Sequence, residues 1–266
     1  MTEAGTTSES RIQVGGSEVE YRIYQPGSAN PLVFLHDGLG SMGSWKDFPR
    51  DLAVATGKTA VVYSREGHGW SDPLRQPRTP DFMHREALAL DQFLHELELS
   101  DVVFVGHSDG ATISLILTGQ HRWASGLILI APHVFVEPET IAGIEQAVRR
   151  FETTDLPQRL ARYHRDPEEI FKAWSEIWLD PAFRDWNIED SLPNIQCPVL
   201  LVQAVDDEYG TMAQLDAIER GVIGPVERLT LSQGGHSPHV SHPDQVSEAV
   251  IRFVSRLGPD AGGIGR

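Results

Sequence analysis

The chain has 266 residues, of which 40% are hydrophobic and 23% are charged, and these values fit a globular domain whose core can enclose a pocket. Its 38 acidic and 22 basic residues give a formal net charge of −16. Because such a field repels polyanions, nucleic acid and anionic membrane surfaces are not expected partners.

The first predicted elements form a hairpin. Residues 18–24 alternate between apolar and charged side chains, which predicts a half-buried strand. Gly15 and Gly16 before it predict a turn from a short strand at residues 11–14. The strands after the hairpin are almost purely apolar, as is typical of a parallel sheet covered on both faces. They are predicted at residues 32–35, 59–63, 102–105, 127–131 and 199–205.

Helical patterns alternate with these strands, which predicts an α/β sheet with right-handed crossovers. They lie at residues 85–99, 111–118 and 244–257. From residue 136 to residue 193 only helical patterns occur, at 139–151, 156–163, 167–178 and near Asp190. We therefore expect a helical cap at 136–193, inserted into a core domain of residues 1–135 and 194–266.

The predicted cap is rich in aromatic residues, namely Phe171, Trp174, Trp178, Phe183 and Trp186. Packing onto the core is the commonest use of such side chains. The alternative is that some of them line a pocket at the carboxyl edge of the sheet. We expect Trp174 and Trp178 to do so, together with His107 from the core.

The strongest motif is Gly106-His107-Ser108-Asp109-Gly110, which matches G-x-S-x-G. It follows an apolar strand and precedes a helix, the context of a nucleophile elbow. A sharp turn there strains the serine and leaves no room for side chains at Gly106 and Gly110. Ser108 is thus the predicted nucleophile, placed at a helix N-terminus that favours a developing oxyanion.

A glycine-containing loop, His36-Asp37-Gly38-Leu39-Gly40, follows the apolar strand at residues 32–35. Such a loop can bring a backbone N–H to the carbonyl oxygen under attack. The candidate donors are Gly38 or Leu39 from this loop and Asp109 from the elbow. The simpler alternative is a plain turn from strand to helix.

The candidate acid and base follow later in the chain. Asp206-Asp207-Glu208 ends the strand at 199–205, and the carboxyl ends of parallel strands face the site crevice. His236 follows a strand-like run at residues 226–231, so the chain order is serine, acid, histidine. His236, His239 and His242 are spaced by three, but Pro238 disrupts a ligand-bearing helix, so no metal site is predicted.

Together these segments resemble the α/β-hydrolase superfamily over nearly the whole chain. Residues 65–71, Arg-Glu-Gly-His-Gly-Trp-Ser, are also similar to the family's R-G-x-G-x-S segment. The resemblance implies a mostly parallel eight-stranded sheet flanked by helices, with a helical cap. In the family the acid lies three residues after the small residue that ends its strand. Ala204 fills that place, which indicates Asp207, with Asp206 as the alternative.

The resemblance implies a serine carboxylesterase that acts on a small-molecule substrate, with the triad Ser108, Asp207 and His236 and no cofactor. Epoxide hydrolases and haloalkane dehalogenases of this fold carry aspartate at the position of Ser108, which argues against both. The same triad can cleave a lactone, a thioester or a carbon–carbon bond in a dienoic ketone, and some members only bind a ligand. The loop at His36-Asp37-Gly38 departs from the family's usual His-Gly start, so Gly38 and Leu39 both stay candidates.

The expected location is cytoplasmic. Cys197 is the single cysteine, so no internal disulfide or oxidising compartment is implied. Residues 1–10 lack the apolar segment of a signal peptide, and no apolar run is long enough to span a membrane. The sequence makes no prediction of an oligomeric state.

Overall fold

The computed structural model describes residues 9–25 and 30–257. These residues form one eight-stranded sheet in the order β1-β2-β4-β3-β5-β6-β7-β8. The pairs β1–β2 and β2–β4 are antiparallel, and β4, β3, β5, β6, β7 and β8 run parallel. The strands are β1 (Glu9–Val14), β2 (Ser17–Tyr24), β3 (Leu32–Leu35), β4 (Ala60–Tyr63), β5 (Val102–His107), β6 (Ala124–Ile130), β7 (Val199–Ala204) and β8 (Val226–Leu231).

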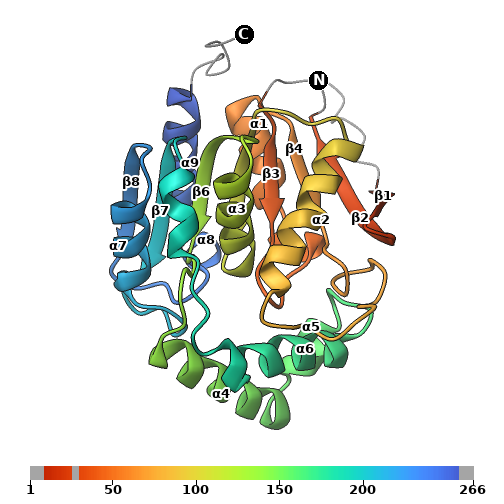
Figure 1. Cartoon of the computed structure of the whole chain (residues 1–266). Coiled ribbons are helices and arrows are strands. Elements are labelled where there is room, and N and C mark those ends of the chain that lie inside the picture. Colours follow the sequence, from red (N-terminus) through yellow and green to blue (C-terminus); the bar gives the residue numbers. More distant parts are fainter. Residues whose placement is uncertain (1–8, 26–29, 258–266) are drawn as a thin grey trace.

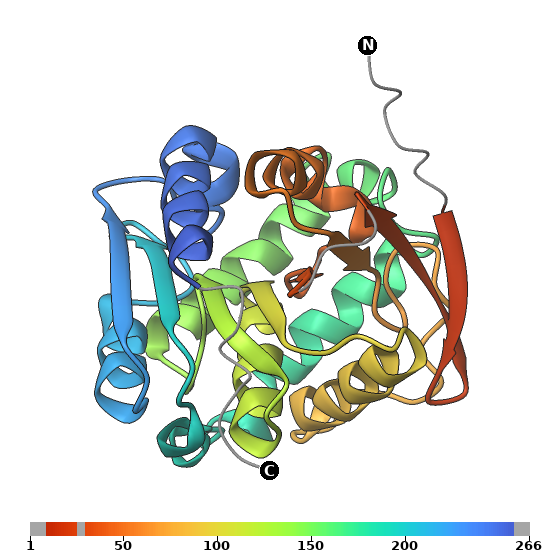
Figure 2. The ribbon, with the colours of Figure 1, turned by 90° about the horizontal axis from the view of Figure 1, so that it is seen from above.

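Helices lie on both faces of this sheet and beyond one of its edges (Figures 1 and 2). The α-helices are α1 (Phe48–Thr56), α2 (Phe82–Glu96), α3 (Asp109–Gln120), α4 (Pro138–Thr153), α5 (Leu156–Leu160), α6 (Pro167–Leu179), α7 (Met212–Gly221), α8 (Pro238–Ser241) and α9 (Pro243–Arg256). The 3-10 helices are η1 (Met42–Trp45), η2 (Pro181–Phe183) and η3 (Glu189–Asn194). None of the described helices is long and apolar enough to cross a membrane.

The central strands are apolar because both of their faces are buried. In β3, Val33 and Leu35 join the core on the side of α2 and α3, whereas Leu32 and Phe34 join the core on the side of α1 and α9. This division follows from the alternation of side chains along a strand. The α/β class and the mostly parallel eight-stranded sheet expected from the sequence are confirmed.

The helices α4, α5 and α6 lie below the edge where the parallel strands end (Figure 1). The two ends of this insertion are side by side, since Phe135 bridges Asn187 and the N–H of Ile188 donates to the carbonyl of Val134 at 2.8 Å. Its aromatic residues are buried in one cluster that is continuous with the core under α2 and α3. The insertion is therefore held at both anchors directly over the edge that carries the elbow.

Candidate active site

Ser108 stands between the end of β5 and the start of α3. Its backbone has φ +53° and ψ −119°, a region that costs an L-residue free energy. The turn is closely packed: a Cβ at Gly106 would lie 2.5 Å from the Cα of Ala111, and one at Gly110 would lie 2.2 Å from the carbonyl oxygen of Leu35. The elbow can therefore form only with glycine at both positions, and it holds Ser108 at the N-terminus of α3.

A continuous chain of hydrogen bonds links Ser108 to His236 and Asp207. The Nε2 atom of His236 is 2.8 Å from the Oγ of Ser108, and its Nδ1 is 2.8 Å and 3.0 Å from the two carboxylate oxygens of Asp207. With Nδ1–H donating to the carboxylate, Nε2 is left to accept a proton from the serine. The backbone N–H of Tyr209 also donates to Asp207 at 2.9 Å, which fixes the carboxylate.

Charges around the imidazole make it a stronger base. Burial alone would lower the pKa of His236, but the carboxylate of Asp207, followed by Glu208 and Asp37, outweighs burial and raises it. Burial would likewise raise the pKa of Asp207, but the charge and the hydrogen bond of His236 and the Tyr209 N–H lower it. Asp207 therefore stays ionised beside His236.

The two neighbours of Asp207 hold the backbone of the histidine loop. A carboxylate oxygen of Asp206 accepts from the N–H of Gly235 at 2.9 Å, and one of Glu208 accepts from the N–H of His236 at 3.0 Å. Three consecutive carboxylates thus contact the loop, but only Asp207 contacts the imidazole ring. Asp206, the alternative acid, is placed to position the loop.

The loop after β3 lies against the elbow. A Cβ at Gly38 would lie 2.9 Å from a carboxylate oxygen of Asp109 and 2.3 Å from the Cδ1 atom of Trp174, so the insertion presses directly on this loop. Among the described residues, no hydrogen bond uses the backbone N–H of Gly38, Leu39 or Asp109. These N–H groups are therefore available to donate to an oxygen atom beside Ser108. Gly38 and Leu39 both stay candidates for the loop donor.

The model of the Alpha/beta hydrolase family matches residues 32–249. The chain belongs to this family. It is 24% identical over 261 residues to the Homo sapiens protein serine hydrolase BPHL, covering 94% of this chain and 87% of that protein.

Two solved structures illustrate the range of this hydrolase fold. An esterase (EaEST) from Exiguobacterium antarcticum superposes with a TM-score of 0.74 at 19% identity, covering 93% of this chain and 100% of that one. A proline iminopeptidase from Mycobacterium smegmatis superposes with a TM-score of 0.67 at 18% identity, covering 94% and 98%. Because both share the fold, the fold does not define which bond a member cleaves.

In this hydrolase, Ser108 opens into a hollow of about 150 Å³. Its lining residues come from the elbow, the loop after β3, the acid and histidine loops, and the helices α4 and α6. They are Asp37, Gly38, Leu39, Ser108, Asp109, His133, Thr140, Ile144, Trp174, Trp178, Glu208, Tyr209, His236 and Ser237. Trp174 and Trp178 thus lie in the wall, whereas Phe183 and Trp186 stack on each other in the core at 5.1 Å between ring centres.

The expectation that His107 lines the pocket is wrong. Side chains alternate along β5, so the residue before Ser108 points to the opposite face of the sheet. His107 there contacts the rings of Trp45 and His239, and its Nε2 donates to the carbonyl of His236 at 2.8 Å. It supports the histidine loop from behind.

The structure separates the three histidines of the His236, His239, His242 pattern. His239 is buried against Trp45 and Phe48, with ring centres 4.9 Å and 5.6 Å away, and Nδ1 of His242 lies beside the Ser241 hydroxyl. The rings of two residues that the sequence motifs do not include, His133 and Tyr209, lie near His236 instead, at 5.7 Å and 4.8 Å between ring centres. The position of Tyr209, two residues after the acid, was the available signal.

Proposed function

We propose that this chain is a serine carboxylesterase that cleaves a small neutral ester through an acyl-enzyme. The observation that carries the proposal is the pair of 2.8 Å contacts that join Ser108 to His236 and His236 to Asp207. A serine hydroxyl is a weak nucleophile alone and needs an adjacent base. This chain places such a base on it, with a carboxylate that orients the base.

In the proposed reaction His236 takes the Ser108 proton while Oγ attacks the ester carbonyl. Asp207 stabilises the imidazolium that forms. The oxyanion accepts from the N–H of Asp109 and from that of Gly38 or Leu39, and each such donor lowers the barrier by about 3–4 kcal/mol. His236 then protonates the leaving alcohol, and later it takes a proton from the water that releases the acid. The reaction needs no cofactor.

The hollow supports a small, neutral substrate. Its volume of about 150 Å³ is below the roughly 300–1,000 Å³ of pockets for drug-sized ligands. Asp37, Asp109 and Glu208 line it, and their carboxylates oppose an anionic substrate. Within the proposal, residues 136–193 act as a cap whose Trp174 and Trp178 limit the length of the acyl or alcohol group.

The test combines labelling with a substrate panel. A fluorophosphonate probe should label the wild-type protein and leave Ser108→Ala unlabelled. Methyl butyrate should then be hydrolysed faster than monomethyl succinate, which adds a carboxylate at similar size. Equal labelling of both proteins would remove Ser108 from the site. Faster cleavage of a lactone, a thioester or a dienoic ketone in the same panel would replace the ester.

A further inference from the structure

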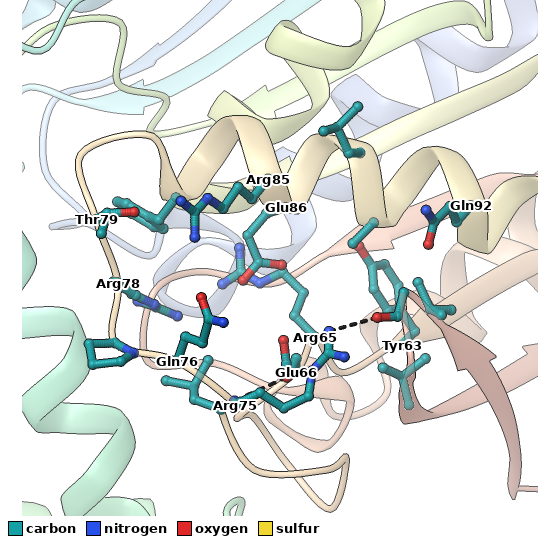
Figure 3. Close-up of a pocket in the computed structure, with 18 residues that line it drawn as sticks. Tyr63, Arg65, Glu66, Arg75, Gln76, Arg78, Thr79, Arg85, Glu86 and Gln92 are labelled. Atoms are coloured by element: carbon teal, nitrogen blue, oxygen red, sulfur yellow. Dashed lines mark hydrogen bonds and ion pairs between the residues drawn. The ribbon is translucent and has the colours of Figure 1, made fainter.

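A second hollow lies beside the helix α2 (Figure 3). Its volume is about 400 Å³, within the range of small-ligand pockets. The β1–β2 turn, the segment at residues 63–79 and the helix α2 enclose it, and none of its lining residues lines the hollow at Ser108. The larger of these two hollows therefore has no part in the proposed ester cleavage.

Arginines dominate the charged lining of this second hollow. Four arginines and two glutamates line it, namely Arg65, Arg75, Arg78, Arg85, Glu66 and Glu86. Arg75 pairs with Glu66 at 2.8 Å, and Arg85 pairs with Asp81 at 2.8 Å. Arg65 and Arg78 have no such partner among the described residues, so positive charge remains at the inner wall of a chain whose net charge is −16.

The two arginines keep hydrogen-bond donors unused. Arg65 is 1% exposed, yet its Nε and Nη1 atoms are buried without an acceptor in the described ranges, and the same holds for Nε and Nη1 of Arg78. Arg78 is nevertheless fixed in place, because it packs over the ring of Phe82 and its Nη2 donates to His68 at 2.8 Å. Buried donors are almost always paired in proteins, so four unused ones in one wall indicate a ligand that accepts from them.

Glu86 lines the same hollow as Arg65 and Arg78 and interacts electrostatically with both of them. Burial raises its pKa, and the charges of Arg65 and Arg78 offset only part of that effect. Glu86 therefore holds a proton more readily than an exposed glutamate does. In its neutral form it leaves the arginine charge uncompensated and can itself donate to an anion.

We propose that the second hollow binds a small carboxylate with an apolar body. The carboxylate accepts from Arg65 and Arg78, whose planar guanidinium groups match its two oxygens. The apolar body packs on the rest of the lining, which includes Val14, Val19, Tyr63, Leu74, Phe82 and Leu88. Because the unused nitrogen atoms are closed to solvent, binding includes a rotation of side chains at the inner wall.

The same arginines hold the loop that carries Gly38 and Leu39. Nη2 of Arg65 donates to the carbonyl of Asp37 at 2.9 Å. Nη2 of Arg78 donates to Nε2 of His68, whose Nδ1–H donates to the carbonyl of Gly40 at 2.9 Å. The proposed carboxylate site therefore adjoins the site at Ser108 through this loop without overlapping it.

Titration calorimetry tests the site with hexanoate as the probe. Hexanol, which lacks the charge, and inorganic phosphate, which lacks the apolar body, are the matched comparisons. Wild-type protein should bind hexanoate at millimolar concentration and at least about tenfold more tightly than either. No binding of hexanoate, or equal binding of hexanol, would overturn the proposal.

Two variants locate the binding. Arg78→Gln removes half of the anion contact, and Ala89→Phe fills the hollow from α2 while keeping both arginines. Each should weaken hexanoate binding at least about tenfold, whereas Arg50→Gln, which removes an exposed arginine on α1, should not change it. Thermal unfolding checks that the variants are folded. Unchanged binding in folded Arg78→Gln or Ala89→Phe would contradict the assignment.

Discussion

Two hollows of this molecule differ in sign, and an arginine that lines one of them holds a loop that lines the other. The hollow at Ser108 measures about 150 Å³ and is lined by Asp37, Asp109 and Glu208, whereas the hollow beside α2 measures about 400 Å³ and is lined by four arginines. Their charges act on each other: burial raises the pKa of Asp109, and Arg65 and Arg78 oppose that rise. Size alone therefore does not identify a reaction site, because the larger of these two hollows has no activated nucleophile among its lining residues.

The largest expected effect is a loss of catalysis that leaves ligand binding in the other hollow unchanged. Asp207→Asn should lower kcat for methyl butyrate by about 10⁴, because the amide no longer fixes the imidazole tautomer or stabilises the imidazolium. Steady-state kinetics measures this loss. Hexanoate binding, which depends on the other hollow, should not change.

Asp206→Asn is the matched control for that variant. Among the described residues, the Asp206 side chain forms a hydrogen bond only with the N–H of Gly235, and asparagine keeps an oxygen that can accept from it. The loss of kcat should therefore stay within about tenfold. A larger loss in Asp206→Asn than in Asp207→Asn would transfer the role of triad acid to Asp206.

The next effect concerns the wall of the smaller hollow. Trp174→Ala should enlarge it and shift preference toward longer acyl chains, changing the ratio of kcat/KM for hexanoyl and acetyl esters by about tenfold. Trp186→Ala is the control, because Trp186 is buried in the same insertion but does not line the hollow. If both variants lost stability and neither changed the ratio, the tryptophans would be packing residues only.

The catalytic hollow could be anticipated further than the arginine hollow, for a physical reason. Strand and elbow predictions depend on local patterns: the apolar runs at β3, β5 and β7 and the two glycines around Ser108 all act within a few residues. Ser108, Asp207 and His236 could then be assigned from their positions after the predicted strands. By contrast, α1 and α7 were not predicted, although each buries one apolar face, with Leu52 and Ala53 of α1 and Leu215 and Ile218 of α7.

The arginine hollow combines segments far apart in the chain. Val14, Arg65 and Glu86 meet only after the hairpin, the loop after β4 and α2 have packed together. In the sequence, Arg65 belongs to the segment that is similar to a family motif, and no pattern distinguishes Arg78 from other charged residues. The error at His107 has a different origin: the predicted strand ended at residue 105, whereas β5 continues through His107, where the alternation of side chains directs the ring away from that of Ser108.

A smaller effect should follow from removing one negative charge from the Ser108 hollow. Both carboxylate oxygens of Asp109 are buried without a hydrogen-bond donor from the described residues. Asp109→Asn keeps the backbone N–H and the shape while removing the charge. The ratio of kcat/KM for monomethyl succinate to that for methyl butyrate should rise roughly fivefold.

Glu66→Gln is the control for the Asp109 variant, because it removes a carboxylate from the other hollow. It should leave that substrate ratio unchanged. An equal rise in both variants would mean that the net charge of the whole protein, rather than the local charge at Ser108, sets the preference for neutral esters.

The smallest expected effect is a shift of the pH profile. Catalysis needs the neutral imidazole, so kcat/KM rises as the pH passes upward through the pKa of His236. Burial lowers that pKa, while Asp207 and then Glu208 raise it. Glu208→Gln removes one raising charge and keeps an oxygen for the His236 N–H, so the acid limb should move to lower pH by roughly 0.3–0.5 unit. Glu168→Gln on α6, which does not line the hollow, should not move it. Because Glu208 is exposed, the shift should shrink at high salt. A shift to higher pH would show that Glu208 acts on His236 by positioning its backbone rather than by its charge.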